Sequence, residues 1–368
     1  FSLDYYTGQH LNKLPVTSAS LFDIASLTKL LATTALTAQA IANGQLSLQT
    51  SVHTVLPNYA GHKETTVEDL LAHRSGLPPW RPLYKSALEV ADGVFSQESV
   101  RISPLAYEAF TDARKRTLTS ALKIQPNQSI GVRQYSDVGF ILLGALLERT
   151  LSAPLDALYA DLAKRIGLDD TTYQDLSAGT SSSAQPFVVT GDQRPRPVVE
   201  GIKEHYVAGQ TKTQLRLGEV DDDNAYALGG VAGHAGLFST AQDVARFGTW
   251  LINTLGQNTP LGKVWRQFVI PDDSAKGAVR GLGVDLPSRT GSSIGTKLGA
   301  KGPSGAIGHL GFTGCSLWVD LDRQASVALL TNRVWSDRQQ NPVFRALRPE
   351  LHDGIADLID AHSSGTAQ

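Results

Sequence analysis

The sequence predicts an α+β protein built from two closely packed lobes. At 368 residues, the chain exceeds the size at which a single hydrophobic core usually keeps growing. The segment Ser26–Asn43 is apolar around most of its helical circumference, which is typical of a buried helix. The segment Leu317–Thr331 has two apolar runs separated by a polar turn, which indicates an antiparallel hairpin. Helices and antiparallel strands are therefore both expected.

The first two elements along the chain are a strand and this buried helix. Phe1–Tyr6 has the composition of a strand and is followed by a turn at Thr7-Gly8. Because the chain opens inside a strand, we expect it to be processed or truncated at this end. The helix that begins near Ser26 stops at Asn43-Gly44, which is a common signal for a helix C-terminus.

A short capped helix and a turn come next. The spacing of Thr66 and Asp69 is that of a capping box, so a helix is expected over Thr66–His73. The Gly and Pro cluster at Gly76–Pro79 then forces a turn. We take this turn as the first boundary between the two lobes.

The middle of the chain is expected to be helical and then to form loops. Residues 80–125 carry helical periodicity in pieces, and Val138–Leu147 is an apolar helix with Ser136 or Asp137 as its N-cap. From Ile166 to Asn224 the sequence is polar and rich in Ser, Thr, Gly and Pro, which is typical of long surface loops. Loops of this length often contribute to function.

The last third of the chain should supply the sheet and a closing helix. Gly229–Phe238 is dense in glycine, which indicates a close approach of backbone to another group. We expect His309–Gly314 to open the strand that continues through Val319, with a turn before the return strand that ends at Thr331. A helix is predicted over Pro349–Ala361 with the proline in its first turn. Its expected apolar face consists of Leu351, Ile355, Leu358 and Ile359.

Composition limits the partners that this chain can have. The formal net charge is −2, charged residues make up 18% of the chain, and no long run of one sign occurs, so nothing favours a nucleic-acid partner. No segment approaches the apolar length of an integral membrane span. The single Cys315 excludes an intrachain disulfide and is most simply a buried apolar residue. We expect a small-molecule partner and favour a periplasmic or secreted location over a cytoplasmic one.

Ser26 and Lys29 are the first candidates for chemistry. Their spacing places a hydroxyl and an amine on one helix face near a helix N-terminus. A buried lysine must pair with an acid or have its pKa lowered, and an amine with a lowered pKa could take the serine proton. Alternatively, Ser26 is a helix cap and Lys29 a solvated side chain, because this short motif is common.

Two further polar residues have a structural interpretation beside a functional one. Tyr135 precedes the predicted helix at Val138, and it is either a site residue or a buried tyrosine with a satisfied hydroxyl. His234 lies in the glycine-dense segment, where it could line a site, although an imidazole held by backbone groups is favoured. Neither residue decides the function by itself.

Three motifs taken together identify a family resemblance. Ser26-Leu27-Thr28-Lys29, Tyr135-Ser136-Asp137 and His309-Leu310-Gly311 resemble, in this order, the motifs of the class C β-lactamase and penicillin-binding-protein superfamily. Leu71–Pro78 and Gly236–Asp243 are also similar to segments of that family. The resemblance covers nearly the whole chain. It implies an antiparallel sheet flanked by helices plus an all-helical lobe, with the active site in the cleft between them.

The resemblance also implies a lobe division and a role for each site residue. Residues 1–76 and 225–368 would form the sheet lobe, and residues 77–224 the mainly helical lobe. Ser26 would be the acylated nucleophile, Lys29 its partner amine and Tyr135 the phenol that passes a proton to the leaving group. His309 stands where many members have lysine. The remaining positions expected to bind the oxyanion or the substrate are Phe312, Asp137, Leu310 and Gly311.

The sequence departs from the family pattern in three places, and the first two bear on the substrate. Asp137 replaces a frequent asparagine, so a carboxylate either faces the acyl side chain of the substrate or pairs with Lys29. Leu310 replaces a threonine or serine that helps to hold the carboxylate of a β-lactam. The part of the chain that precedes the Ser26 motif is expected to be shorter than is usual in the family. Esterase-like activity is therefore favoured over β-lactamase activity, unless Arg333 or Arg345 supplies a cation for a carboxylate.

We therefore expect a serine hydrolase that works through an acyl-enzyme on an ester, a D-amino-acid amide or a β-lactam. No metal or organic cofactor is expected, since the histidines show no H-x-x-x-H or H-x-H spacing. The substrate would be a small molecule or a peptidoglycan-derived compound. The alternative is a non-catalytic or slowly turning over protein that binds cell-wall fragments or β-lactams. The sequence leaves the oligomeric state open.

Overall fold

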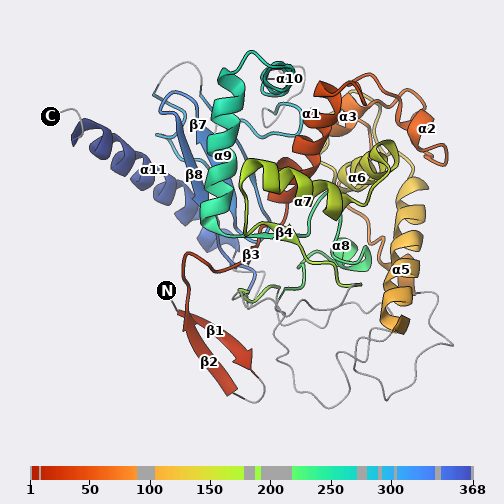
Figure 1. The fold of residues 1–368 in the computed structure, drawn as a ribbon, viewed down its shortest axis with the longest axis horizontal. Coiled ribbons are helices and arrows are strands. Elements are labelled where there is room, and N and C mark those ends of the chain that lie inside the picture. Colours follow the sequence, from red (N-terminus) through yellow and green to blue (C-terminus); the bar gives the residue numbers. More distant parts are fainter. Residues whose placement is uncertain are drawn as a thin grey trace.

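The computed structural model shows helices packed around small antiparallel sheets (Figure 1). It describes residues 2–7, 10–88, 104–177, 187–191, 218–271, 280–288, 292–301, 305–335 and 341–365. Most of the loop segment predicted between Ile166 and Asn224 lies outside these ranges. The first strand is confirmed, since β1 (Ser2–Thr7) pairs antiparallel with β2 (His10–Pro15).

The predicted buried helix is confirmed, but its first part has an unexpected geometry. It begins as a π-helix, η1 (Lys29–Thr34), and continues as α1 (Ala35–Ala42), with every residue of η1 buried. A π-helical turn widens the helix and is often found at functional sites. The helix ends at Asn43, and Gly44 has a φ of 72°, which fits the predicted stop signal.

The chain enters this helix from a short central strand. The strand β3 (Phe22–Asp23) pairs antiparallel with β5 (Leu237–Ser239), and β4 (Thr172–Tyr173) lies on the other side of β5. Between β3 and η1, Ala25 has a φ of 46°, a left-handed conformation that is costly for a residue with a Cβ. This turn changes the chain direction just before Ser26.

Helices account for most of the remaining regular secondary structure in the described residues. The capping box at Thr66 and Asp69 is present, and Ser136 is the N-cap of the helix that follows Tyr135. The helices are α2 (Val52–Val55), α3 (Val67–Leu71), α4 (Lys85–Leu88), α5 (Pro104–Leu122), α6 (Asp137–Leu151), α7 (Leu155–Ile166), α8 (Asp223–Ala227), α9 (Ala241–Gly256), α10 (Pro260–Phe268) and α11 (Asn341–Gly365).

The C-terminal sheet has three antiparallel strands rather than two. Its order is β6 (Ala306–Leu310), β7 (Ser316–Asp320) and β8 (Ala325–Leu329). The prediction that His309 opens the strand through Val319 was therefore wrong. His309 lies near the end of β6, and the chain reverses over residues 311–315 before β7 begins. Gly314, with a φ of 97°, permits this tight turn.

The two faces of this sheet pack against different helices (Figure 1). On β7, Leu317 and Val319 belong to the main hydrophobic core, and Gly248 of α9 lies against Val319. Trp318 points the other way and packs in a second cluster that includes Ala356 of α11. This alternation follows from the two-residue period of a strand. Consequently α9 covers one face and α11 the other.

The predicted C-terminal helix begins earlier than expected. It starts at Asn341, so Pro349 lies inside the helix and not in its first turn. Pro342, which directly follows Asn341, takes the first-turn position that suits a residue without an N–H. The predicted apolar face was also wrong in part, since Leu358 is 71% exposed whereas Ile355 and Ile359 pack inward. The fully buried residues of α11 are His352 and Ala356.

One hydrophobic core joins the two segments that the sequence analysis assigned to separate lobes. Leu30 of η1 and Leu142 of α6 are both fully buried in it. Gly233 also lies close to α6, because a Cβ at that position would lie 2.2 Å from the Phe140 carbonyl oxygen. The lobe boundaries at residues 76 and 225 remain a prediction. Cys315 is buried, as predicted.

Length and hydropathy decide whether a described helix could span a membrane. No single described helix is long and apolar enough to cross a bilayer. Only α6 and α7 taken together reach that length and composition, and the two are bent by 82° at their junction.

Candidate active site

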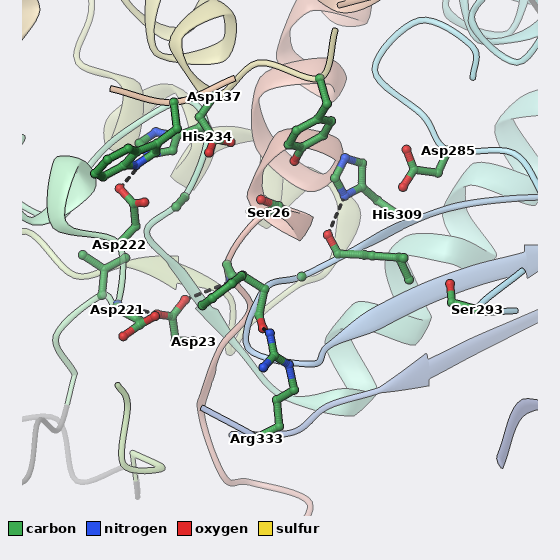
Figure 2. A pocket seen from close by; sticks show the side chains of 18 of the residues that line it. Asp23, Ser26, Asp137, Asp221, Asp222, His234, Asp285, Ser293, His309 and Arg333 are labelled. Atoms are coloured by element: carbon green, nitrogen blue, oxygen red, sulfur yellow. Dashed lines mark hydrogen bonds and ion pairs between the residues drawn. The ribbon is translucent and has the colours of Figure 1, made fainter. Parts of the chain in front are cut away.

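A cavity of about 890 Å³ opens beside the start of the buried helix (Figure 2). Seven of the eight residues expected at the site line it, while Lys29 lies beneath the cavity floor and is fully buried. The seven lining residues are Ser26, Tyr135, Asp137, His309, Leu310, Gly311 and Phe312. The fold therefore brings together residues that are separated by up to 286 positions in the sequence.

Ser26 and Lys29 are in direct contact. The Lys29 ammonium donates a hydrogen bond to Ser26 Oγ over 2.8 Å and another to the His234 carbonyl oxygen over 3.1 Å. The predicted spacing of three residues thus puts both groups on one helix face. The alternative of a solvated Lys29 is wrong, since its side chain has no exposed surface.

The third partner of Lys29 is Asp137. Its Oδ1 lies 2.7 Å from Lys29 Nζ, which confirms the predicted pairing of these residues. Burial acts to lower the pKa of Lys29, but the charges of Asp137 and Tyr135 outweigh burial and hold that pKa above its ordinary value. Of the two states that the sequence left open, the acid-paired ammonium is the one found. Lys29 is therefore not a neutral amine at pH 7.

Tyr135 completes this cluster. Its hydroxyl is hydrogen-bonded with the side chains of Lys29 and Ser26, and Lys29 Nζ lies 5.0 Å from its ring centroid. Burial raises the pKa of Tyr135, although the Lys29 charge acts in the opposite direction. The hydroxyl is therefore protonated at neutral pH. The ring stacks on His73 with centroids 4.5 Å apart, and His73 Nδ1 accepts the Ser136 N–H over 2.9 Å.

His309 borders the cluster but does not provide a positive charge. Burial lowers its pKa, despite the nearby Asp285 carboxylate, so the imidazole is neutral at pH 7. Arg280 supplies a cation near Tyr135 instead, with its guanidinium carbon 4.8 Å from the tyrosine ring centroid. An ion pair with Asp285 fixes Arg280, and Asp285 is in turn bound to Gly308 of β6 through two backbone hydrogen bonds.

The backbone around Ser26 is suited to bind a developing oxyanion. Within the described residues, the Ser26 N–H has no hydrogen-bond acceptor, whereas the next three N–H groups bond to Ile24, Ala25 and Ser26 carbonyls. Phe312, whose N–H is the second expected donor, lies across the cavity in the turn after β6. Thr313 holds that turn close to the segment before Ser26, because its Oγ1 donates to the Asp23 carbonyl oxygen over 2.8 Å.

Asp23 shapes the turn that presents Ser26. Its carboxylate accepts the Ala25 N–H over 2.8 Å and the Asp221 N–H over 2.6 Å, so it connects the left-handed residue to the loop before α8. The side chain is buried, and burial raises its pKa to about 7 despite these two hydrogen bonds. Asp23 is therefore a positioning residue whose charge state changes near neutral pH.

This raised pKa predicts a pH-dependent stability. Between about pH 4 and 7, the folded protein holds a proton on Asp23 that the unfolded chain has released, so the free energy of unfolding must fall as pH rises. The loss amounts to at most about 1.4 kcal/mol per pH unit. We expect Asp23→Asn to lack this contribution. Urea unfolding of both proteins from pH 4.5 to 8 checks it, and a pH-independent stability difference between them would contradict it.

Acidic residues lie on both sides of Ser26 in the cavity. In Figure 2, Asp221, Asp222, His234 and Asp23 lie on one side, and His309, Asp285 and Ser293 on the other. Ser293 is joined to α11 because its carbonyl oxygen accepts a hydrogen bond from His352 Nδ1 over 2.9 Å. The arginines that line the cavity besides Arg280 are Arg333, Arg345 and Arg348, of which the last two belong to α11.

Several of these residues had no signal in the sequence. Arg280, Arg348 and Asp222 carry no motif, and an isolated charged residue is most often solvated. The glycine-dense segment did point to His234, but the favoured prediction of an imidazole held by backbone groups was wrong, because ring Nε2 binds the Asp222 carboxylate. The residue lines the cavity, as the other interpretation expected, and its carbonyl oxygen accepts a hydrogen bond from Lys29. Within the described residues, no three His, Cys, Asp or Glu side chains form a group that could hold a metal ion.

Comparison with known proteins gives a consistent result. A family model described as Beta-lactamase matches residues 3–349. The N-acetylmuramyl-L-alanine amidase of Bacillus subtilis (strain 168) is 29% identical over 355 residues, which cover 92% of this chain and 74% of that protein. A putative D-alanyl-D-alanine carboxypeptidase of Escherichia coli (strain K12) is 28% identical over 353 residues, which cover 92% and 76% of the two chains.

A solved structure supports the fold assignment. EstCE1, described as a hydrolase with promiscuous acyltransferase activity, aligns with a TM-score of 0.59 at 16% identity. The alignment covers 92% of this chain and 90% of that chain. This likeness confirms the predicted α+β fold class.

Proposed function

Because the chain belongs to the β-lactamase family of serine hydrolases, we propose that it forms an acyl-enzyme at Ser26 and cleaves amides whose leaving group ends in a carboxylate. Peptides that end in a D-amino acid are the substrate class that this proposal favours. The name of the Escherichia coli relative, a putative D-alanyl-D-alanine carboxypeptidase, agrees with such a leaving group.

The observation that carries the proposal is the environment of Arg348. Its side chain lines the cavity, the residue is only 6% exposed, and it has no hydrogen bond or ion pair within the described part of the chain. It only lies over the Phe344 ring, 4.9 Å from its centroid, and burial lowers its pKa. A buried cation without a counter-ion is costly, and a substrate carboxylate would compensate that cost.

The environment of Arg348 favours a different substrate class from the ester that the sequence suggested. The esterase preference rested on Leu310 and neutral His309, which offer a carboxylate neither a hydroxyl nor a charge. Arg345, one of the two residues named as possible replacements, lines the cavity beside Arg348. The arginines of α11 favour an anionic leaving group, and the esterase preference remains an untested alternative.

The proposed acylation uses the resting charges of the site. The Lys29 ammonium donates to Ser26 Oγ, which leaves the serine proton directed toward Tyr135. As Ser26 Oγ bonds to the carbonyl carbon, its proton enters the hydrogen-bonded cluster, in which Asp137 is the anionic member. The Ser26 and Phe312 N–H groups would stabilise the oxyanion.

The intermediate then collapses and the enzyme is regenerated. The bond from the carbonyl carbon to the leaving nitrogen breaks, and Tyr135 passes one proton from the cluster to that nitrogen. Water later attacks the acyl carbon and gives a proton to the cluster. The bond from that carbon to Ser26 Oγ then breaks, and Ser26 Oγ takes a proton from the cluster. Arg280 would stabilise any negative charge that develops on Tyr135 during these transfers.

A matched pair of peptides tests the proposed leaving group. Nα,Nε-diacetyl-Lys-D-Ala-D-Ala carries a terminal carboxylate, and the same peptide with a C-terminal amide does not. We expect kcat/KM to favour the carboxylate by about tenfold to a hundredfold, the range of one charge-assisted hydrogen bond. Arg348→Gln should reduce this ratio, while Arg165→Gln, on the exposed side of α7, should not. Faster cleavage of p-nitrophenyl butyrate than of either peptide would restore the esterase alternative.

The nucleophile is tested by covalent labelling. A penicillin or fluorophosphonate adduct should map by mass to the peptide that contains Ser26 and should be absent from Ser26→Ala. Label at another residue would refute the assignment. An adduct at Ser26 that never turns over would favour the alternative of a binding protein or sensor.

A further inference from the structure

The acidic end of the cavity has features of a second recognition site. Figure 2 shows Asp221 and Asp222 with His234 on the side of Ser26 that lies away from His309 and Ser293. If the α11 arginines bind the leaving group, as proposed above, this opposite side must face the acyl part of the substrate. The inference below rests on that proposed function.

His234 presents a buried acceptor atom at this end. Its Nε2 lies 2.8 Å from Asp222 Oδ1, and because a carboxylate can only accept, Nε2 carries the proton. The other nitrogen, Nδ1, is then a lone-pair acceptor in the neutral ring. Nδ1 is buried, and it has no hydrogen-bond partner within the described residues, although the residue lines the cavity and is only 1% exposed. A ligand with an N–H donor would satisfy it.

The surroundings of this acceptor are negatively charged. Asp222 stays ionised, because the hydrogen bonds that it accepts from His234 Nε2 and the Ala225 N–H hold the pKa of that carboxyl below its usual range, although burial acts to raise it. Asp222 is also the N-cap of α8, where its carboxylate accepts the Ala225 N–H over 2.8 Å. Asp221 and Asp223, its two neighbours in the sequence, also line the cavity. Such a wall repels an anionic acyl group and attracts a cationic one.

An aromatic side chain completes the site. Trp80 lines the cavity and is 40% exposed, and its ring centroid lies 6.4 Å from that of Tyr84, which lines the cavity too. Tyr84 is attached to the start of α8, because its N–H donates to Asn224 Oδ1 over 3.0 Å. An exposed indole face is a favourable neighbour for an ammonium group.

We propose that Asp222, His234 and Trp80 form a subsite for a primary ammonium group on the acyl part of the substrate. The ammonium would donate to His234 Nδ1, lie in the field of Asp222 and its acidic neighbours, and contact the Trp80 ring. The favoured substrate is then a peptide with a cationic acyl part and an anionic leaving group, cleaved between the two charges.

Two pairs of substrates test the subsite separately from the leaving group. The first pair is Nα-acetyl-Lys-D-Ala-D-Ala and its Nε-acetylated form, which differ only in the ammonium. The second pair is the p-nitrophenyl esters of 6-aminohexanoic acid and hexanoic acid, whose leaving group carries no carboxylate. We expect kcat/KM to favour the ammonium in both pairs, by roughly tenfold, which is the effect of one charge-assisted hydrogen bond.

Variants are judged by the ratio within each pair, so that a general loss of activity cancels. Asp222→Asn keeps a residue that can cap α8 but removes the charge, and Trp80→Leu removes the indole. Both should bring the ratio toward one. Asp161→Asn, an exposed acid on α7 outside the cavity, is the matched control and should leave the ratio unchanged.

The outcomes separate the subsite from the function on which it rests. A ratio near one in the unaltered protein for every pair that is hydrolysed would overturn the subsite, while cleavage of the D-Ala-D-Ala peptides would leave the proposed function standing. If neither peptide is cleaved but the aminohexanoate ester is preferred, the proposed leaving group fails and the subsite stands. An ammonium preference that survives Asp222→Asn and Trp80→Leu would also overturn the assignment.

Discussion

Replacing Lys29 with alanine is expected to lower kcat by about 10²–10⁴-fold, with a much smaller change in KM. Lys29 Nζ contacts Ser26 Oγ, Asp137 and Tyr135 at once, so its loss disconnects the nucleophile from the groups that accept its proton. Steady-state kinetics on the diacetyl tripeptide measures the effect. Lys297→Ala is the matched control, because that lysine is exposed and pairs with Asp357 far along the chain.

The same experiment includes Tyr135→Phe, which removes one hydroxyl from the cluster. We expect a loss of similar size in kcat, and we expect the double variant to lose little more than either single one, since the groups act as one unit. Tyr59→Phe provides a control, because its hydroxyl binds Thr65 outside the cavity. Full kcat in either single variant, or fully additive losses, would refute the cluster as drawn.

The second large effect is expected from Asp137→Asn. Without the carboxylate, burial dominates the environment of Lys29, so the pKa of the lysine must fall. Breaking a pair in which one partner is fully buried also costs as much as about 3–5 kcal/mol of unfolding free energy.

The pH dependence of kcat/KM measures this change. If the Lys29 ammonium is needed, activity falls at alkaline pH through an apparent pKa that belongs to the coupled Lys29 and Tyr135 groups. In Asp137→Asn this alkaline limb should move to lower pH. Asp156→Asn, on the surface of α7, should not move it. An unchanged limb in Asp137→Asn would show that the carboxylate does not set the charge of Lys29.

The sequence was sufficient to predict the residues that gather around the nucleophile. Ser26 and Lys29 are three positions apart on a buried helix, and this local geometry alone brings their side chains within hydrogen-bond distance. Tyr135 was predictable from its place before the capped helix α6 together with the family resemblance. The pairing of Asp137 with Lys29 could be named as one of two options, but only the structure selected it.

Other features depend on contacts that no local pattern records. The π-helical start of η1 places Thr33 and Thr34 against the Gly233 and Gly283 carbonyl oxygens, which lie some 200 or more positions away. His309 was assigned to the wrong strand, because a strand before a glycine turn and a strand after it have the same alternating pattern. The start of α11 was predicted too late in the chain. Proline is favoured in the first turn of a helix, so the prediction began at Pro349, whereas this proline lies inside the helix.

By itself, the sequence was enough to predict the fold class and the side chains that gather around Ser26, since periodicity, capping residues and short motifs act over a few residues. Tertiary structure alone decided the charges that surround them. Whether Lys29 is an ammonium depends on burial and on Asp137, and whether Arg348 and His234 Nδ1 have partners depends on which distant segments pack beside them. Electrostatic energies depend on distance and burial in three dimensions, and neither can be obtained from the order of residues along a chain.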